Sequence, residues 1–171
     1  MQGSRFAAGL RRAAAVTALA AATLGGAAAC TNPVSGGHDA RRTGGVAIYL
    51  GGTEVARSQG TTVTGALPTV AVGEQSELLT IVFVDGGGDP LDFSGSSDLY
   101  VRARSADPGI AGFEVTGYDG RVVGEGEGAT TIQFDLMHGT PPSGGHADFT
   151  SRPIPVEVQG AVQGVQGGQS R

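Results

Sequence analysis

Short runs of β-branched and apolar residues, separated by glycine, proline and aspartate, follow one another through most of this chain. Ten such runs can be distinguished, at residues 46–50, 54–58, 61–64, 69–72, 78–84, 99–104, 112–116, 121–123, 130–137 and 154–158. Runs of this length and spacing are typical of an all-β sandwich. No stretch after residue 29 has the period of an amphipathic helix. We therefore expect an all-β protein.

Two of the runs alternate clearly between apolar and polar residues. Residues 99–104 place Arg102 and Arg104 on one face of a strand, and residues 130–137 place Ile132, Phe134 and Leu136 on one face of another. A period of two residues indicates a strand with one face in the core and one face in water. The alternation predicts half-buried antiparallel strands.

Two further segments predict how strands are placed and connected. Residues 78–84 are apolar almost throughout, which favours a central strand. Gly51 and Gly52 stand between two strand-like runs. Glycine readily takes the positive φ that the favoured two-residue hairpin turns require, so this pair predicts a tight hairpin.

The composition restricts both the size of the core and the class of partner. Of the 171 residues, 31 are glycine, aromatic residues make up 5%, and tryptophan is absent, which favours one modest core of roughly 100 residues over a large multidomain enzyme. All 11 basic residues are arginine, against 16 acidic residues, and the net charge is −5. Nucleic-acid binding requires the opposite sign, so we expect no nucleic-acid partner.

The N-terminus has the order of a secretory signal peptide. Arg5, Arg11 and Arg12 precede the uncharged, alanine-rich residues 13–29. These 17 residues are too few and too weakly apolar for a membrane-spanning helix, which needs about 20 strongly apolar residues. We expect residues 1–29 to be removed on export.

Cys30 is the single cysteine of the chain and directly follows the predicted signal peptide. This position resembles that of the lipid-accepting cysteine in bacterial lipoprotein signals: Ala28 and Ala29 match the pattern, whereas Ala27 replaces the usual leucine. The alternative is ordinary cleavage after Ala29, which leaves a free thiol. Because a lone exposed thiol is a liability in an oxidising compartment, we favour lipidation. The prediction is a protein anchored to a bacterial membrane, on the periplasmic face or the cell surface.

The mature chain divides into three parts. Residues 30–45 predict a lipid-anchored flexible tether, residues 46–158 the folded domain, and residues 159–171 a disordered tail of glycine and glutamine. Removal of residues 1–29 leaves 8 basic and 16 acidic residues. An acidic domain is not expected to bind anionic lipid headgroups.

Within the folded part, residues 107–111 read Asp-Pro-Gly-Ile-Ala, and Gly124 and Gly128 are followed by two threonines and Ile132. These motifs resemble bacterial Ig-like domains of the second group, over about residues 77–158. The resemblance implies an Ig-like antiparallel β-sandwich and says almost nothing about function. The chain departs from that family in residues 137–152, which are longer than the usual connection.

The same long segment contains the candidate metal ligands His138, His146 and Asp148. Imidazole and carboxylate groups suit Zn²⁺ or Cu²⁺, and Met137 offers a thioether to copper. The segment also resembles uncharacterised exported bacterial proteins ending in Leu-Met-His-Gly…His-Ala-Asp-Phe, several of which have further histidines where residues 120–124 have none here. The alternative is that both histidines are simply exposed loop residues. If a metal binds, both histidines should bind it, and its affinity should fall below about pH 6.5.

Other polar segments carry weaker signals. Asp85, Asp89 and Asp92 suggest calcium, but their spacing fails the EF-hand pattern and a turn explains them equally well. Residues 124–128 are too acidic to bind phosphate, and residues 94–97 lack a nucleophile elbow. We therefore expect no enzyme. The leading hypothesis is a non-catalytic lipoprotein of the cell envelope whose Ig-like domain binds a protein or small ligand, and the alternative is a metal-binding accessory protein.

Overall fold

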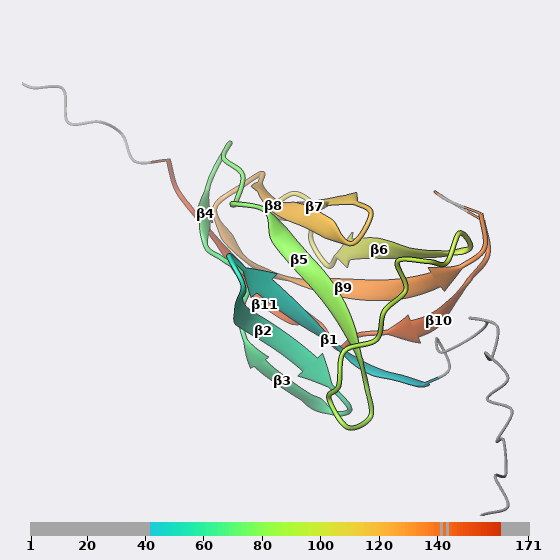
Figure 1. The fold of residues 1–171 in the computed structure, drawn as a ribbon. Helices are drawn as coiled ribbons and strands as arrows, with labels where there is room; N and C mark the ends of the chain where they lie inside the picture. Colours follow the sequence, from blue (N-terminus) through green and yellow to red (C-terminus); the bar gives the residue numbers. More distant parts are fainter. Residues whose placement is uncertain (1–41, 141, 143, 162–171) are drawn as a thin grey trace, which may run out of the picture. The chain divides into compact units, whose positions relative to one another are not determined.

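Eleven strands make up most of the residues that the computed structural model describes, which are 42–140, 142 and 144–161. No α-helix occurs in these residues, and none of their segments is a helix long and apolar enough to cross a membrane. The strands, shown in Figure 1, are β1 (Thr43–Leu50), β2 (Thr53–Gln59), β3 (Thr62–Gly65), β4 (Val70–Ala71), β5 (Leu79–Asp85), β6 (Leu99–Ser105), β7 (Ala111–Thr116), β8 (Asp119–Gly124), β9 (Gly128–His138), β10 (His146–Thr150) and β11 (Ile154–Gln159).

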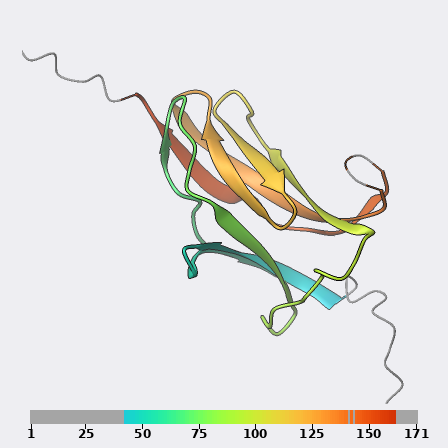
Figure 2. The same cartoon turned by 45° about the horizontal axis from the view of Figure 1, so that its top comes forward.

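The strands form two sheets. Sheet A has six strands in the order β3-β2-β1-β5-β8-β7. In sheet B the strands pair in the order β10-β9-β11-β4. Strand β6 also pairs with β9, along residues 132–138. All strand pairs are antiparallel except β4 with β11, where Val70 and Val158 are parallel partners. Figure 2 shows the two sheets as separate layers.

Aromatic side chains from the two sheets meet in the core between them. Phe113 of β7 contacts Phe134 of β9 edge to face, with ring centroids 5.0 Å apart. Phe83 of β5 contacts Phe149 of β10 in the same way at 6.0 Å. Burying one such side chain stabilises the fold by roughly 1.5–3 kcal/mol. The packing confirms the predicted β-sandwich, with the one parallel pair as an exception to the antiparallel arrangement.

The detailed strand predictions are confirmed where the sequence alternates. Ile132, Phe134 and Leu136 are fully buried, and β5 lies inside sheet A between β1 and β8. Leu50 and Thr53 are paired across Gly51 and Gly52, whose φ angles are 56° and 82°. The two glycines therefore form the expected hairpin.

Strand ends differ from the predicted runs by a few residues at several places, and the differences at β1 and β10 are the most informative. Strand β1 begins at Thr43 rather than at Val46, because residues 43–45 pair with β5. Gly45 lies so close to β2 that a Cβ atom would be 2.6 Å from the Ser58 carbonyl oxygen, so a glycine in this strand reflects close approach of the backbones. The sequence predicts no strand at His146–Thr150, yet these residues form β10. It forms because β9 extends to His138 and offers it a pairing edge.

Some predictions concern residues outside the described part. The signal peptide at residues 1–29, the lipidation site Cys30, the tether up to residue 41 and the tail from residue 162 all lie outside the described residues.

Candidate metal site

The hairpin formed by β9 and β10 brings the predicted ligands together. His138 and His146 are direct partners in the pairing of these strands, and their ring centroids lie 5.5 Å apart. His138 follows Ile132, Phe134 and Leu136 at intervals of two residues, so it belongs to the inner face of β9, at the end where the core stops. The inner face thus changes from apolar side chains to imidazole at the edge of the sandwich.

A β-bulge in β10 positions the third candidate ligand. Ala147 pairs with Met137 and Phe149 pairs with Leu136, so Asp148 is an extra residue between two regular pairs. In a regular strand Asp148 and Phe149 would lie on opposite faces. The bulge allows Phe149 to reach Phe83 in the core while Asp148 contacts His146.

The distances among the three side chains approach those of a coordination sphere. Asp148 Oδ1 lies 2.9 Å from His146 Nε2, and Asp148 Oδ2 lies 3.5 Å from His138 Nδ1. One ligand atom from each residue lies within 4.8 Å of the others. Zinc ligands at 2.0–2.1 Å in a tetrahedron are about 3.4 Å apart. Small side-chain movements would therefore suffice to surround one ion.

Glycines in the connection between β9 and β10 make this close approach possible. Gly145 has a φ of 96°, and a Cβ atom there would lie 1.8 Å from the His138 carbonyl oxygen. A larger residue would separate the two strand ends. The Tyr100 hydroxyl donates a hydrogen bond of 2.8 Å to the Gly144 carbonyl oxygen and fixes the connection against β6.

The site is open to solvent on one side and supported by the protein on the other. The exposed fraction is 26% for the His138 side chain and 16% for that of Asp148, against 71% for that of His146. An ion could reach the site from solvent without rearrangement of the fold.

Met137 does not belong to this cluster. It is buried and pairs with Tyr100 and Ala147. Because neighbouring residues of a strand point to opposite faces, its thioether faces away from His138. The suggestion that Met137 completes a copper site is therefore wrong.

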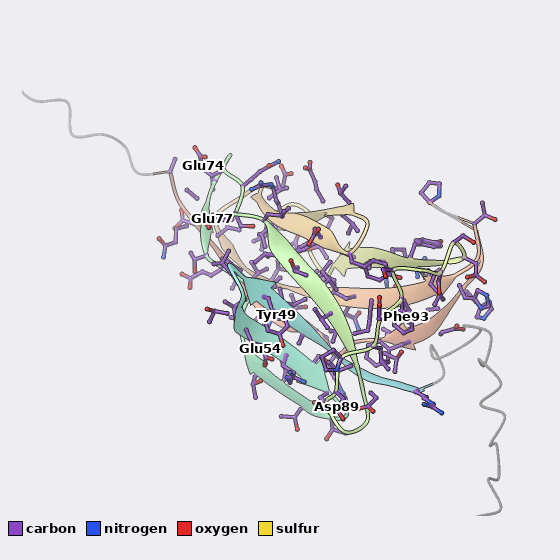
Figure 3. The ribbon with its side chains drawn as sticks, in the orientation of Figure 1. Tyr49, Glu54, Glu74, Glu77, Asp89 and Phe93 are labelled. Atoms are coloured by element: carbon purple, nitrogen blue, oxygen red, sulfur yellow. The ribbon has the colours of Figure 1, made fainter. Side chains whose placement is uncertain are left out.

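The acidic segment after β5 forms turns. Asp85 Oδ1 accepts hydrogen bonds from the backbone N–H groups of Gly87 and Asp89, and the bonds from Asp89 and Gly87 lower the pKa of Asp85. Asp92 Oδ1 accepts one from the N–H of Ser94. Figure 3 shows Asp89 beside the tip of this segment. Within the described residues, His138, His146 and Asp148 form the one cluster with metal-site geometry, so these aspartates are explained by the turns.

Two polar features of sheet B and its edge were not singled out from the sequence. Asp98 Oδ2 lies 2.9 Å from His138 Nε2. On the outer face of sheet B, the carboxylate of Asp135 accepts hydrogen bonds from Arg102, Arg104 and Thr150. The paired arginines were visible in the alternation of residues 99–104, whereas their partner could be found only through the pairing of β6 with β9.

Comparison with known proteins adds little. No protein-family model matches the chain, and no curated protein matches it. Among solved structures, the chain is similar to the S-layer protein SbsC, domains 4 and 5, with 15% identity and a TM-score of 0.38. The alignment covers 60% of this chain and 62% of that chain, which is less than two thirds of its length. A likeness of this size supports no statement about function.

Proposed function

We propose that this chain is a non-catalytic lipoprotein of the bacterial cell envelope whose Ig-like β-sandwich binds a divalent transition metal through His138, His146 and Asp148. The observation that carries the proposal is the convergence of ligand atoms from these three residues within 4.8 Å. They come from both strands of one hairpin and from a bulge whose extra residue is the carboxylate.

The chemistry of the ligands favours Zn²⁺ or Cu²⁺. Two imidazole nitrogens and one carboxylate oxygen are a common set of zinc ligands and leave a fourth position for water. Imidazole also suits Cu²⁺, whereas Cu⁺ prefers thiolate and thioether ligands. Since Met137 is buried on the opposite face of β9, the site lacks such a ligand.

The envelope location rests on the N-terminal sequence. Replacing the predicted lipid-accepting residue, Cys30→Ala, should move the protein from the membrane fraction to the soluble exported fraction, because the folded part is acidic and has little affinity for anionic lipids. Unchanged membrane association of Cys30→Ala would contradict the lipoprotein assignment.

A second candidate function is binding of a small ligand or a protein segment without a metal. A groove of about 460 Å³ lies between β6 and β7, with Tyr100, Val101, Phe113 and Val115 among its lining residues. Ligand sites are commonly concave and mostly apolar with a few polar groups, and Arg102 is a polar group at this groove.

Equilibrium dialysis of the purified protein against Zn²⁺ and Cu²⁺ separates the two candidates. The parent should bind one equivalent at micromolar metal, and His138→Ala and His146→Ala should each weaken binding at least 100-fold. The matched control is His38→Ala, which removes the third histidine of the chain. Absence of binding by the parent, or equal binding by all variants, would leave the metal-free candidate.

A further inference from the structure

Asp98 is held against the end of β9 by backbone pairing. It directly precedes β6, whose first residue, Leu99, is the partner of His138 in the sheet. The N–H of Gly139 donates a hydrogen bond of 2.7 Å to the Asp98 carbonyl oxygen. The carboxylate of Asp98 is thereby placed beside the imidazole of His138, with 2.9 Å between Oδ2 and Nε2.

This contact selects one of the two neutral forms of His138. A carboxylate only accepts hydrogen bonds, and a neutral imidazole has one N–H donor and one nitrogen with a lone pair. For a neutral ring, the 2.9 Å contact with the Asp98 carboxylate favours the tautomer with the proton on Nε2. The lone pair is then on Nδ1, which faces Asp148 Oδ2 at 3.5 Å. In this tautomer Nδ1 and Asp148 Oδ2 are both electron-pair donors, and a cation bound by both atoms would offset their mutual repulsion.

We propose that Asp98 is a positioning residue of the metal site: it keeps the proton of His138 on Nε2 and presents Nδ1 to the ion. This inference rests on the proposed metal-binding function. A second hydrogen bond of this kind commonly orients a ligating histidine and raises its basicity, and its loss lowers metal affinity by about 10- to 100-fold. Together Asp98 and Asp148 also supply two negative charges to balance a divalent cation.

The tautomer can be measured on the metal-free protein. Long-range ¹H–¹⁵N correlation spectra at about pH 8, where an ordinary imidazole is neutral, should show the proton of His138 on Nε2 in the parent. The Asp98→Ala variant should show a mixture of tautomers, whereas Asp98→Asn should keep the parent form, because its amide oxygen still accepts from Nε2–H. A proton on Nδ1 in the parent would overturn the assignment.

Zinc affinity provides the second readout. Asp98→Ala should bind Zn²⁺ about 10- to 100-fold more weakly than the parent, and Asp98→Asn should lie between the two. Glu125→Ala is the matched control, because it removes one exposed carboxylate just before the opposite end of β9. Unchanged affinity in Asp98→Ala, or equal losses in both Asp98 variants, would overturn the positioning role, since the second result indicates a direct ligand. If the parent binds no zinc, the proposed function fails, while the spectra still decide the state of His138.

Discussion

Two carboxylates occupy the two faces of the hairpin formed by β9 and β10, and their surroundings are opposite in kind. Asp135, on the outer face, is fully buried beneath Arg102, Arg104 and Thr150, with donor distances between 2.7 and 3.1 Å. Asp148, at the edge of the inner face, is bordered by the imidazoles of His138 and His146.

The difference between these clusters lies in the charge of the partners. Arginine remains protonated at every physiological pH, so Asp135 is neutralised by the protein. Burial raises the pKa of Asp135, but hydrogen bonds from Arg104, Thr150 and Arg102 outweigh this effect and hold the pKa below its usual value. The partners of Asp148 are imidazoles, which, unlike guanidinium groups, have a ring nitrogen that can bind a metal ion. The charge of Asp135 is therefore balanced within the protein, whereas the cluster of Asp148, His138 and His146 is suited to binding a cation from solvent.

The largest expected contrast is in stability without metal. Asp135→Asn should lower the free energy of unfolding by about 2 kcal/mol, because the buried carboxylate loses its charge-assisted hydrogen bonds, whereas the two arginines left behind are nearly half exposed and remain solvated. Asp148→Asn should change it by less than about 0.5 kcal/mol, as substitutions outside such networks usually do. Urea denaturation measures both. Equal losses in the two variants would mean that Asp148 also has a structural role.

The stabilisation of the protein by zinc should depend on Asp148 and not on Asp135. A ligand that binds only the folded state at 100 times its dissociation constant stabilises that state by about 2.7 kcal/mol. This gain should be retained in Asp135→Asn and lost in Asp148→Ala. Thermal unfolding with Zn²⁺ and with a chelator checks it, and a zinc-dependent shift that persists in Asp148→Ala would place the ion elsewhere.

The two clusters should lose their contributions to stability at different pH values. Zinc-dependent stability should decline below about pH 6.5, where imidazoles become protonated. The pKa of Asp135 is lower in the folded protein than the ordinary value of 3.8. Its contribution is therefore present above that ordinary value and is lost as the pH falls through the lower, folded-state pKa. Denaturation curves from pH 7 to pH 3 should show two steps with zinc, and Asp135→Asn should lack the more acidic one.

The smallest expected effect concerns one donor of the Asp135 cluster. Thr150→Val removes a single hydrogen bond to the carboxylate, of 2.7 Å, while both arginines remain. The loss in unfolding free energy should be about 1 kcal/mol, with zinc affinity unchanged. A loss as large as that of Asp135→Asn would show that the arginines alone do not neutralise the carboxylate.

The strands could be predicted wherever side-chain alternation records burial. Residues 99–104 and 130–137 have a period of two, and both form strands with the expected inner faces. Strand β10 has no comparable pattern, since a histidine, an alanine and an aspartate make up most of it. It exists because an edge of β9 is available for pairing, which is a property of the folded sheet.

The candidate site could be predicted only in part for the same reason. His138, His146 and Asp148 could be selected because their chemistry and their closeness along the chain are both visible in the sequence. Asp98 could not, because it lies 40 residues from His138 and reaches it through the pairing of β6 with β9.

Residue chemistry and local spacing thus establish the all-β class, most strand positions and three candidate ligands. The register of β9 with β6 and β10, the bulge at Asp148 and the separation of Met137 from the site come from contacts between distant segments. Such contacts depend on which strand edges meet once the apolar faces are buried together. A shift of one residue in that register would turn His138 to the other face of the sheet, so the site depends on the complete sandwich.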